Sequence, residues 1–229
     1  MVGLASDESR ITLTKIFTQE YLEAERRLVN PDPFSFLYLR AAGLHFRLSI
    51  FFASPDSSDY NEGLLALWHA TRDFLEVAFN IETAAGSLLA YATNYVFQMV
   101  SAAAFTLLKL LNSFFAGYVD IGYGRSLFTR AIRSMRMISV RENDLPSRFA
   151  EVLSQLWKSS GQGSRRHPAA ASNGSENSLQ LKVKCRMSMS LVYDSVWRWR
   201  EEFQHKGQGN LEGTLLSNSV ISHFIFPTF

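Results

Sequence analysis

The feature that most constrains this chain is a run of 21 residues without a charge, Leu88 to Leu108, which reads LLAYATNYVFQMVSAAAFTLL. A helix of this length is long enough to cross a bilayer, and it would serve equally well as the buried central helix of an all-α domain. Asn94 and Gln98 lie near its middle, where amides are disfavoured in lipid, and the flanks lack both an aromatic belt and a clear charge asymmetry. We therefore expect a buried core helix and no membrane partner. A single membrane span through residues 88–108 is the alternative.

Most of the remaining sequence is also typical of helices. Only 6 prolines and 13 glycines interrupt 229 residues. Apolar residues recur at helical spacing, and no long stretch alternates with the period of two expected of a strand. The pattern predicts helices over 9–29, 33–52, 60–81, 88–116, 123–139 and 145–158, with Asp32 as the N-cap of the second and Pro33 as its first residue. The predicted fold class is all-α, a single multi-helix domain around a long buried apolar helix.

A segment rich in Ser, Gly, Asn and Ala separates this body from one last helix. Residues 159–178 hold almost no large apolar side chain, so burial cannot offset the entropy lost on ordering them. We expect a helical body over 1–158, a flexible loop over 159–178, a final helix within 179–206 that packs on the body, and an irregular tail over 207–229.

The final helix contains two tryptophans that alternate with two arginines, at residues 197–200. Placed on a helix, one set of side chains forms an apolar seam: Met189, Val192, Val196, Trp199 and Phe203. Asp194, Arg198 and Glu202 fall on the opposite side, where we expect solvent. Base stacking requires both rings on one exposed basic surface, but Trp199 belongs to the seam and Trp197 to its flank beside Tyr193. We expect a structural helix.

The central helix carries a polar stripe. Asn94, Gln98, Ser101, Lys109 and Asn112 fall within about 80° of one another on a helical wheel. Hydrogen bonding between helices is the simpler explanation, because buried amides need partners, and Lys109 would then extend outward at the helix end. The other interpretation is the polar wall of an internal ligand pocket. Its candidate ligand-binding residues are Asn94, Gln98, Lys109 and Asn112, with Arg133 and Arg136 as further candidates if their helix face turns inward.

The chain shows no motif for catalysis or metal binding. It lacks HExxH, a P-loop, a dinucleotide-binding glycine fingerprint and a nucleophile elbow. A lone cysteine, Cys185, cannot build a disulfide framework or a multi-thiolate metal site. Gly122 and Gly124 follow a helix rather than a strand, so we expect one helix to stop and the next to restart there. The sequence indicates neither an enzyme nor a bound cofactor. An all-α enzyme or lipid carrier with an apolar cavity is the third class considered.

Three stretches together resemble the helical regulatory region of fungal binuclear zinc-cluster transcription factors. They are YVFQMVSAAAFTLLKLLNSFFAGYVD (95–120), RMISVRENDLPSRFAEVLSQLWKS (136–159) and LKVKCRMSMSLVYDSVWRWREEFQ (181–204). The most similar branch is that of the regulator of leucine biosynthesis and its weak-acid-response relatives. The resemblance covers roughly residues 34–206. Its most specific parts are the Asn-Asp-Leu-Pro-x-Arg run that ends in Leu-x-Gln-Leu-Trp and the helix that contains Trp-Arg-Trp-Arg.

The resemblance implies a nuclear, effector-responsive regulator of RNA polymerase II transcription. Its expected partners are a small dicarboxylate or weak-acid effector, the transcription machinery and a second copy in a homodimer. Members of the family bind DNA through an amino-terminal six-cysteine cluster that holds two zinc ions. With Cys185 alone, this chain cannot hold that cluster. We therefore expect no zinc and no DNA-binding residue in this chain, DNA contact only through a missing amino-terminal module, and a truncated gene product.

Overall fold

The computed structural model describes residues 7–86, 88–141, 143–163, 179–182 and 189–205, and within these ranges it contains helices and no strand. The elements in chain order are α1 (Asp7–Arg27), α2 (Pro33–Arg47), η1 (Leu48–Phe52), α3 (Tyr60–Ala85), η2 (Leu88–Tyr91), α4 (Asn94–Leu111), η3 (Phe114–Tyr118), α5 (Ile121–Ile138), α6 (Leu145–Gly163) and α7 (Ser190–His205). The η elements are short 3-10 helices. The predicted all-α fold class is confirmed.

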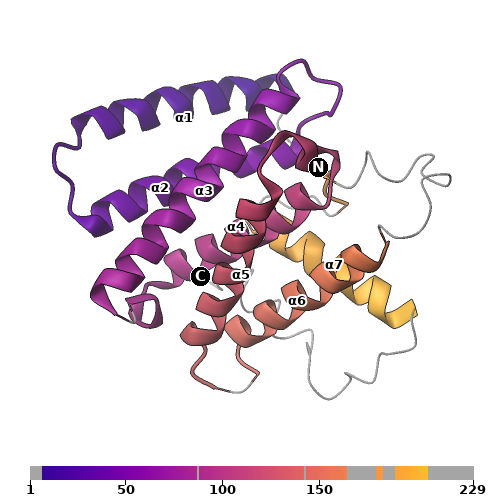
Figure 1. The fold of residues 1–229 in the computed structure, drawn as a ribbon. Coiled ribbons are helices and arrows are strands. Elements are labelled where there is room, and N and C mark those ends of the chain that lie inside the picture. Colours follow the sequence, from indigo (N-terminus) through magenta and orange to yellow (C-terminus); the bar gives the residue numbers. More distant parts are fainter. Residues whose placement is uncertain (1–6, 87, 142, 164–178, 183–188, 206–229) are drawn as a thin grey trace, which may run out of the picture.

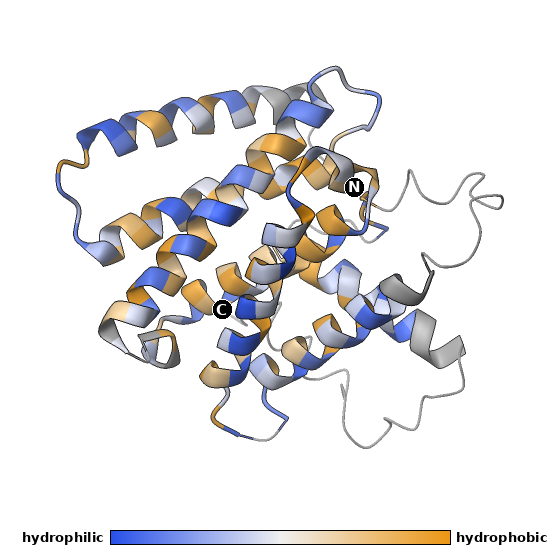
Figure 2. Cartoon of the chain, viewed as in Figure 1, coloured by the Kyte–Doolittle hydropathy of each residue, from blue (hydrophilic) through white to orange (hydrophobic). Residues whose placement is uncertain are grey.

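Helix α4 lies at the centre of this arrangement (Figure 1). It contacts five other helices, namely α2, α3, α5, α6 and α7. On one side, α2 packs mainly against α3, while α1 packs chiefly on α2 and lies at the edge of the molecule. On the other side, α5 and α6 pack against each other, and α7 contacts both α4 and α6. Hydrophobic residues follow α4 and the inward sides of its neighbours (Figure 2).

The burial of α4 matches its role as the core helix. Every residue from Val96 to Leu111 except Gln98 is buried. Phe105 is fully buried, and its ring meets that of Phe149 from α6 edge to face, with centroids 5.8 Å apart. Among the described helices, α4 alone is long and apolar enough to cross a membrane, and 83% of its residues are buried inside the protein. The prediction of a buried apolar helix is confirmed.

The central helix is shorter than the predicted span of 88–116. The chain turns through η2, breaks at Thr93, which has an extended backbone (φ −62°, ψ 154°), and then begins α4. After Asn112 the chain turns again into η3, where the hydroxyl of Ser113 accepts a hydrogen bond from the backbone N–H of Phe115. The sequence stays apolar through both breaks, and Leu89 of η2 and Phe115 of η3 are buried, so periodicity did not reveal the interruptions.

The other helix boundaries agree with the sequence prediction in most places. Asp32 caps α2, since its Oδ1 atom accepts hydrogen bonds from the N–H groups of Phe34 and Ser35 at 2.9 and 3.0 Å. Helix α6 continues to Gly163, so the predicted flexible loop is wrong for residues 159–163. The rest of that loop, 164–178, and the predicted tail, 207–229, lie outside the described residues.

The predicted stop and restart occurs just before these glycines, between η3 and α5, but its placement at Gly122 and Gly124 is wrong, because both glycines lie inside α5. Gly124 is needed for packing. A Cβ atom at this position would lie 2.8 Å from the side chain of Leu111 and 2.9 Å from that of Trp68. The missing side chain therefore lets α5 approach α4 and α3 closely.

The turn before α6 explains the Asn-Asp pair in the sequence. Asn143 adopts a positive φ of 64°, which asparagine tolerates better than most residues. Asp144 then accepts hydrogen bonds from the N–H groups of Ser147, at the start of α6, and of Val140. Although partial burial raises the pKa of Asp144, these hydrogen bonds outweigh it and hold the pKa below its usual value. The carboxylate thus ties the turn after α5 to the first turn of α6.

The central position of α4 generates a stability prediction. We expect Phe105→Ala to lower the free energy of unfolding by about 3–5 kcal/mol, because it leaves a cavity in the core and removes the contact with Phe149. The matched control is Leu13→Ala on α1, where the side chain is 46% exposed. We expect this variant to lower the free energy of unfolding by less than about 1 kcal/mol. Urea unfolding followed by circular dichroism measures both, and equal losses would contradict the central placement of α4.

Candidate functional site

The four predicted ligand-binding residues do not share one environment. They are spread along about 27 Å of helix, since 18 residues separate Asn94 from Asn112. Asn94 and Asn112 are exposed, and the amide of Asn112 donates to the carbonyl of Leu108 in its own helix at 2.8 Å. Gln98 is half-buried, and Lys109 is buried with 9% of its surface exposed. Of the four, Lys109 alone brings a charge into the core.

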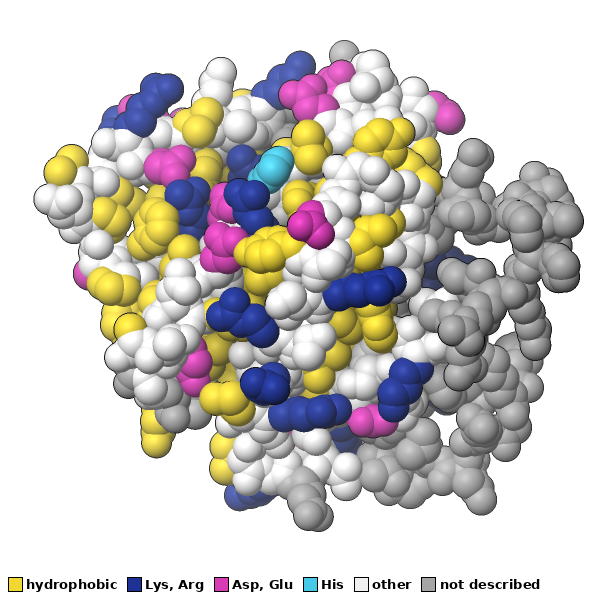
Figure 3. All heavy atoms as spheres, viewed as in Figure 1, with side chains coloured by type: hydrophobic (Ala, Val, Ile, Leu, Met, Phe, Trp, Pro, Cys, Tyr) yellow, Lys and Arg dark blue, Asp and Glu magenta, His cyan; other side chains and the backbone are white. Residues whose placement is uncertain are grey.

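The further candidates, Arg133 and Arg136, lie on the outer side of α5. Arg136 donates to the hydroxyl of Ser154 at 3.4 Å, and the opposite face of the helix packs through Leu127, Phe128, Ala131 and Met135. Figure 3 shows Lys and Arg side chains gathered on the surface over α5. The pocket hypothesis required this face of α5 to turn inward. It faces outward instead.

Lys109 instead forms a buried ion pair with the last helix. Its Nζ atom lies 3.0 Å from Oδ2 of Asp194 on α7, and Asp194 has no exposed surface. The Nε atom of Arg198, one turn later in α7, lies 3.0 Å from the same oxygen. The other carboxylate oxygen, Oδ1, accepts a hydrogen bond from the backbone N–H of Lys182 at 2.6 Å. One carboxylate thus joins α4, α7 and the segment 179–182.

This arrangement corrects the prediction that Asp194 faces solvent. The helical wheel placed it opposite the apolar seam, yet it is buried because Lys109 of α4 needs a counter-charge. The predicted seam itself is confirmed at Val192, Val196 and Trp199, which are all buried. The side chains of Phe203 and Glu202 lie outside the described residues.

The two tryptophans of α7 have different surroundings, as predicted. Trp199 is buried, and its Nε1–H group donates to Oε1 of Gln155 on α6 at 2.9 Å. Trp197 is 42% exposed and stacks on Tyr193 with ring centroids 6.4 Å apart. The rings therefore share no exposed basic surface, and the packing gives no support to nucleic-acid stacking by this motif.

Burial changes the acid–base behaviour of Lys109. Removal from water lowers its pKa from 10.5 to about 8, even though the adjacent carboxylate of Asp194 acts in the opposite direction. The positive charge of Arg198 adds to the lowering. Desolvation therefore outweighs the attraction of the ion pair at this position.

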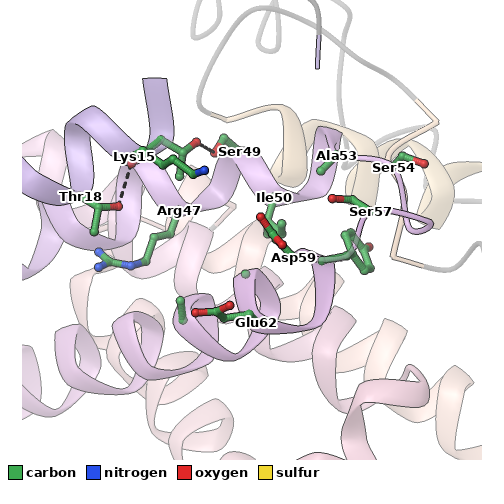
Figure 4. Close-up of a pocket in the computed structure, with 14 residues that line it drawn as sticks. Lys15, Thr18, Arg47, Ser49, Ile50, Ala53, Ser54, Ser57, Asp59 and Glu62 are labelled. Atoms are coloured by element: carbon green, nitrogen blue, oxygen red, sulfur yellow. Dashed lines mark hydrogen bonds between the residues drawn. The ribbon is translucent and has the colours of Figure 1, made fainter. Parts of the chain in front are cut away.

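A cavity of about 380 Å³ lies elsewhere, between α1, η1 and the start of α3 (Figure 4). Its size is typical of a site for a small molecule. Its charged lining residues are Lys15, Arg47, Asp59 and Glu62, and several hydroxyl groups from Thr and Ser residues accompany them. Ile50, Ala53 and Ala66 supply apolar surface. Sequence reasoning missed this cavity because its residues come from four separate elements and form no motif.

Arg47 also lines a neighbouring cavity of about 240 Å³ beneath α1. There, Arg40 is already paired, with Nη2 at 2.7 Å from Oε1 of Glu25 and Nη1 donating to the hydroxyl of Tyr21 at 2.6 Å. The Tyr21 ring lies over Gly43, where a Cβ atom would approach it to 2.7 Å. Arg47 therefore lies at the junction of two cavities and Arg40 in one of them.

The described residues contain no group of three or more His, Cys, Asp or Glu side chains that could hold a metal ion. The charged side chains around the 380 Å³ cavity can bind charged and hydrogen-bonding groups of a small molecule. They contain no nucleophile held by a base and an orienting third group. The arrangement is suited to binding.

The buried ion pair generates a second prediction. Asp194→Asn keeps the shape of the side chain but leaves Lys109 buried without a counter-charge, so we expect a loss of about 3–5 kcal/mol in the free energy of unfolding. The control is Glu201→Gln, which removes an exposed pair with Lys182 at 3.6 Å and should cost below about 1 kcal/mol. Chemical denaturation checks both. Similar losses from the two variants would show that the buried pair has no special role.

The lowered pKa of Lys109 predicts a pH dependence. Between pH 8 and pH 10.5 the unfolded chain holds a proton on this lysine that the folded chain has released. The free energy of unfolding should therefore rise with pH in this window, by at most about 1.4 kcal/mol per pH unit from this group. Wild type and Lys109→Met are compared by urea unfolding across the window. Parallel pH curves for the two proteins would contradict the assignment.

Comparison with known proteins gives no family for this chain. No family model, no curated protein and no solved structure matches it. The likeness to fungal zinc-cluster regulators accordingly rests on the three sequence stretches, and the fold rests on the structure described above.

Proposed function

We propose that this chain is an effector-responsive helical regulatory domain of the kind found in fungal zinc-cluster transcription factors, acting in the nucleus on RNA polymerase II transcription. In this proposal the chain is not an enzyme. DNA contact comes from a module outside these 229 residues, and the transcription machinery is the downstream partner.

The observation that supports the proposal best is where the three resembling stretches lie in the fold. The first includes α4, the second α6 and the third α7, and these three helices pack on one another. The most specific motifs of the second and third stretches meet directly, since Trp199 donates its hydrogen bond to Gln155. The first and third meet through Lys109 and Asp194. The residues that carry the resemblance therefore form one connected unit.

A switch also requires two packing arrangements of the helices that the effector binds with different affinity. A ligand with equal affinity for both does not shift the equilibrium between them. Helix α7 is a suitable moving element. It is held to α4 by a desolvated ion pair whose formation costs nearly as much as it returns, and the segment 179–182 is tied to the same carboxylate. Release of this contact would free both segments together.

The resemblance implies a small dicarboxylate or weak-acid effector. The predicted pocket wall of Asn94, Gln98, Lys109 and Asn112 stays a prediction, and neither described cavity is lined by these residues.

The test joins the full chain to an unrelated DNA-binding domain in a fungal reporter strain. We expect reporter activity to change by about threefold or more when succinate or benzoate is supplied. A change of this size corresponds to a modest coupling free energy between effector binding and transcriptional output. Asp194→Asn should abolish the change because it weakens the attachment of α7, whereas Glu201→Gln should preserve it. The DNA-binding domain alone gives the baseline.

A fluorescently tagged chain supplies the second half of this test. We expect nuclear fluorescence and extraction without detergent. Two results together would contradict the regulatory proposal: reporter activity that does not change, and a chain that is extracted from membranes only with detergent. They would favour a single-span membrane protein in which α4 crosses the bilayer.

A further inference from the structure

Arg47, at the end of α2, is a half-buried cation that forms no ion pair with a carboxylate among the described residues. The ion pairs of the described residues do not include it, in contrast to Arg40 on the same helix, which pairs with Glu25. Burial lowers the pKa of Arg47, but an arginine remains charged at neutral pH. Charges withdrawn from water are normally stabilised by a group of opposite sign, and Glu25 and Asp73 act on Arg47 only from beyond ion-pair distance. The cavity that Arg47 lines is the place where a ligand would supply one.

The guanidinium group of Arg47 is held in position before any ligand arrives. Its Nη1 atom donates to the carbonyl of Gly43 at 2.7 Å. Its central carbon lies 4.4 Å from the ring centroid of Phe46 and 5.1 Å from that of Tyr21. The two rings are adjacent, with centroids 6.0 Å apart, so they flank the guanidinium from one side, and its remaining N–H donors are available to a ligand. A planar, preorganised donor set of this kind suits a carboxylate, which it can bind through two parallel hydrogen bonds.

The opposite wall of the cavity is acidic. Asp59, the N-cap residue of α3, and Glu62, in the first turn of that helix, both line it and form no ion pair with a described residue. Figure 4 shows these two side chains on the α3 side of the cavity, with Arg47 and Lys15 on the side of α1 and α2. The hydroxyl of Ser58 donates to one oxygen of Asp59 at 2.8 Å, which leaves the other for a ligand.

We propose that this cavity binds a small amino-carboxylate, with its carboxylate on Arg47 and its ammonium group facing Asp59 and Glu62. The acidic wall repels a second carboxylate, so a dicarboxylate of the same length is disfavoured. The apolar side chains of Ile50, Ala53 and Ala66 accommodate the carbon chain between the charged ends. This inference concerns binding at the 380 Å³ cavity and goes beyond the proposed regulatory function, whose effector the resemblance implies to be a dicarboxylate or a weak acid.

The experiment uses the purified full chain and four six-carbon probes that differ only in their charged ends: ε-aminocaproate, caproate, n-hexylammonium and adipate. Isothermal titration calorimetry gives the dissociation constants. We expect ε-aminocaproate to bind about tenfold more tightly than caproate or n-hexylammonium, and adipate to bind no better than caproate. Tighter binding of adipate, or equal binding of all four probes, overturns the proposal.

Variants assign the two ends of the ligand. Arg47→Met keeps the apolar stem beside Tyr21 and should weaken binding of ε-aminocaproate and caproate about tenfold while leaving n-hexylammonium unchanged. The double variant Asp59→Asn, Glu62→Gln should make ε-aminocaproate and caproate bind equally. Arg133→Met, which removes the same charge from the exposed face of α5, should change nothing. Unchanged affinity in an Arg47→Met chain with native circular dichroism overturns the assignment.

The two proposals fail separately. A chain that does not prefer ε-aminocaproate, yet still changes reporter activity with succinate or benzoate, loses the amino-carboxylate site and keeps the regulatory function. A chain that prefers ε-aminocaproate, yet leaves the reporter unchanged under every supplied compound, keeps the site and loses the regulatory function.

Discussion

The arrangement of the second half of this protein depends on how the charge of Lys109 is accommodated inside the helical core. Moving an ammonium group out of water costs several kcal/mol, and an apolar bundle offers nothing to offset that cost. Asp194 supplies the opposite charge from α7 and is itself fully buried. Because either group would be strongly destabilising if it were buried alone, a packed α7 must place Asp194 against Lys109. The ion pair therefore determines where the last helix lies and at what rotation about its axis.

The same carboxylate organises more than one helix. Arg198 forms a second ion pair with it, the backbone N–H of Lys182 donates a hydrogen bond to it, and Arg198 also donates to the carbonyl of Gln180. The segment around Leu181, which is buried in the core, is thus also bound to α7. A buried polar group of this kind selects one packing among several apolar alternatives, because a rotated or shifted α7 would leave charges unpaired. Leucines and valines alone tolerate such shifts at modest cost.

Helical periodicity in the sequence predicted the faces of the helices but not their partners. It identified α4 as the core helix, Asp32 as a cap and Val196 with Trp199 as a packing seam. It placed Asp194 in solvent because charged residues are rarely buried, and a single helix gives no sign of a lysine located 85 residues earlier. The cavity beside Arg47 was missed for a related reason, since its walls come from elements that only tertiary folding brings together.

The loose attachment of α1 has a consequence for access to the interior. This helix packs chiefly on α2 and leaves Ile16 and Phe17 about half exposed, so its removal uncovers little of the core. Segments with few buried contacts open at a small fraction of the global unfolding free energy. Molecules can therefore exchange with the space beneath α1 while α3, α4 and the ion pair remain intact. Entry and residence time at that space are then governed by fraying of a peripheral helix, on a timescale separate from that of folding.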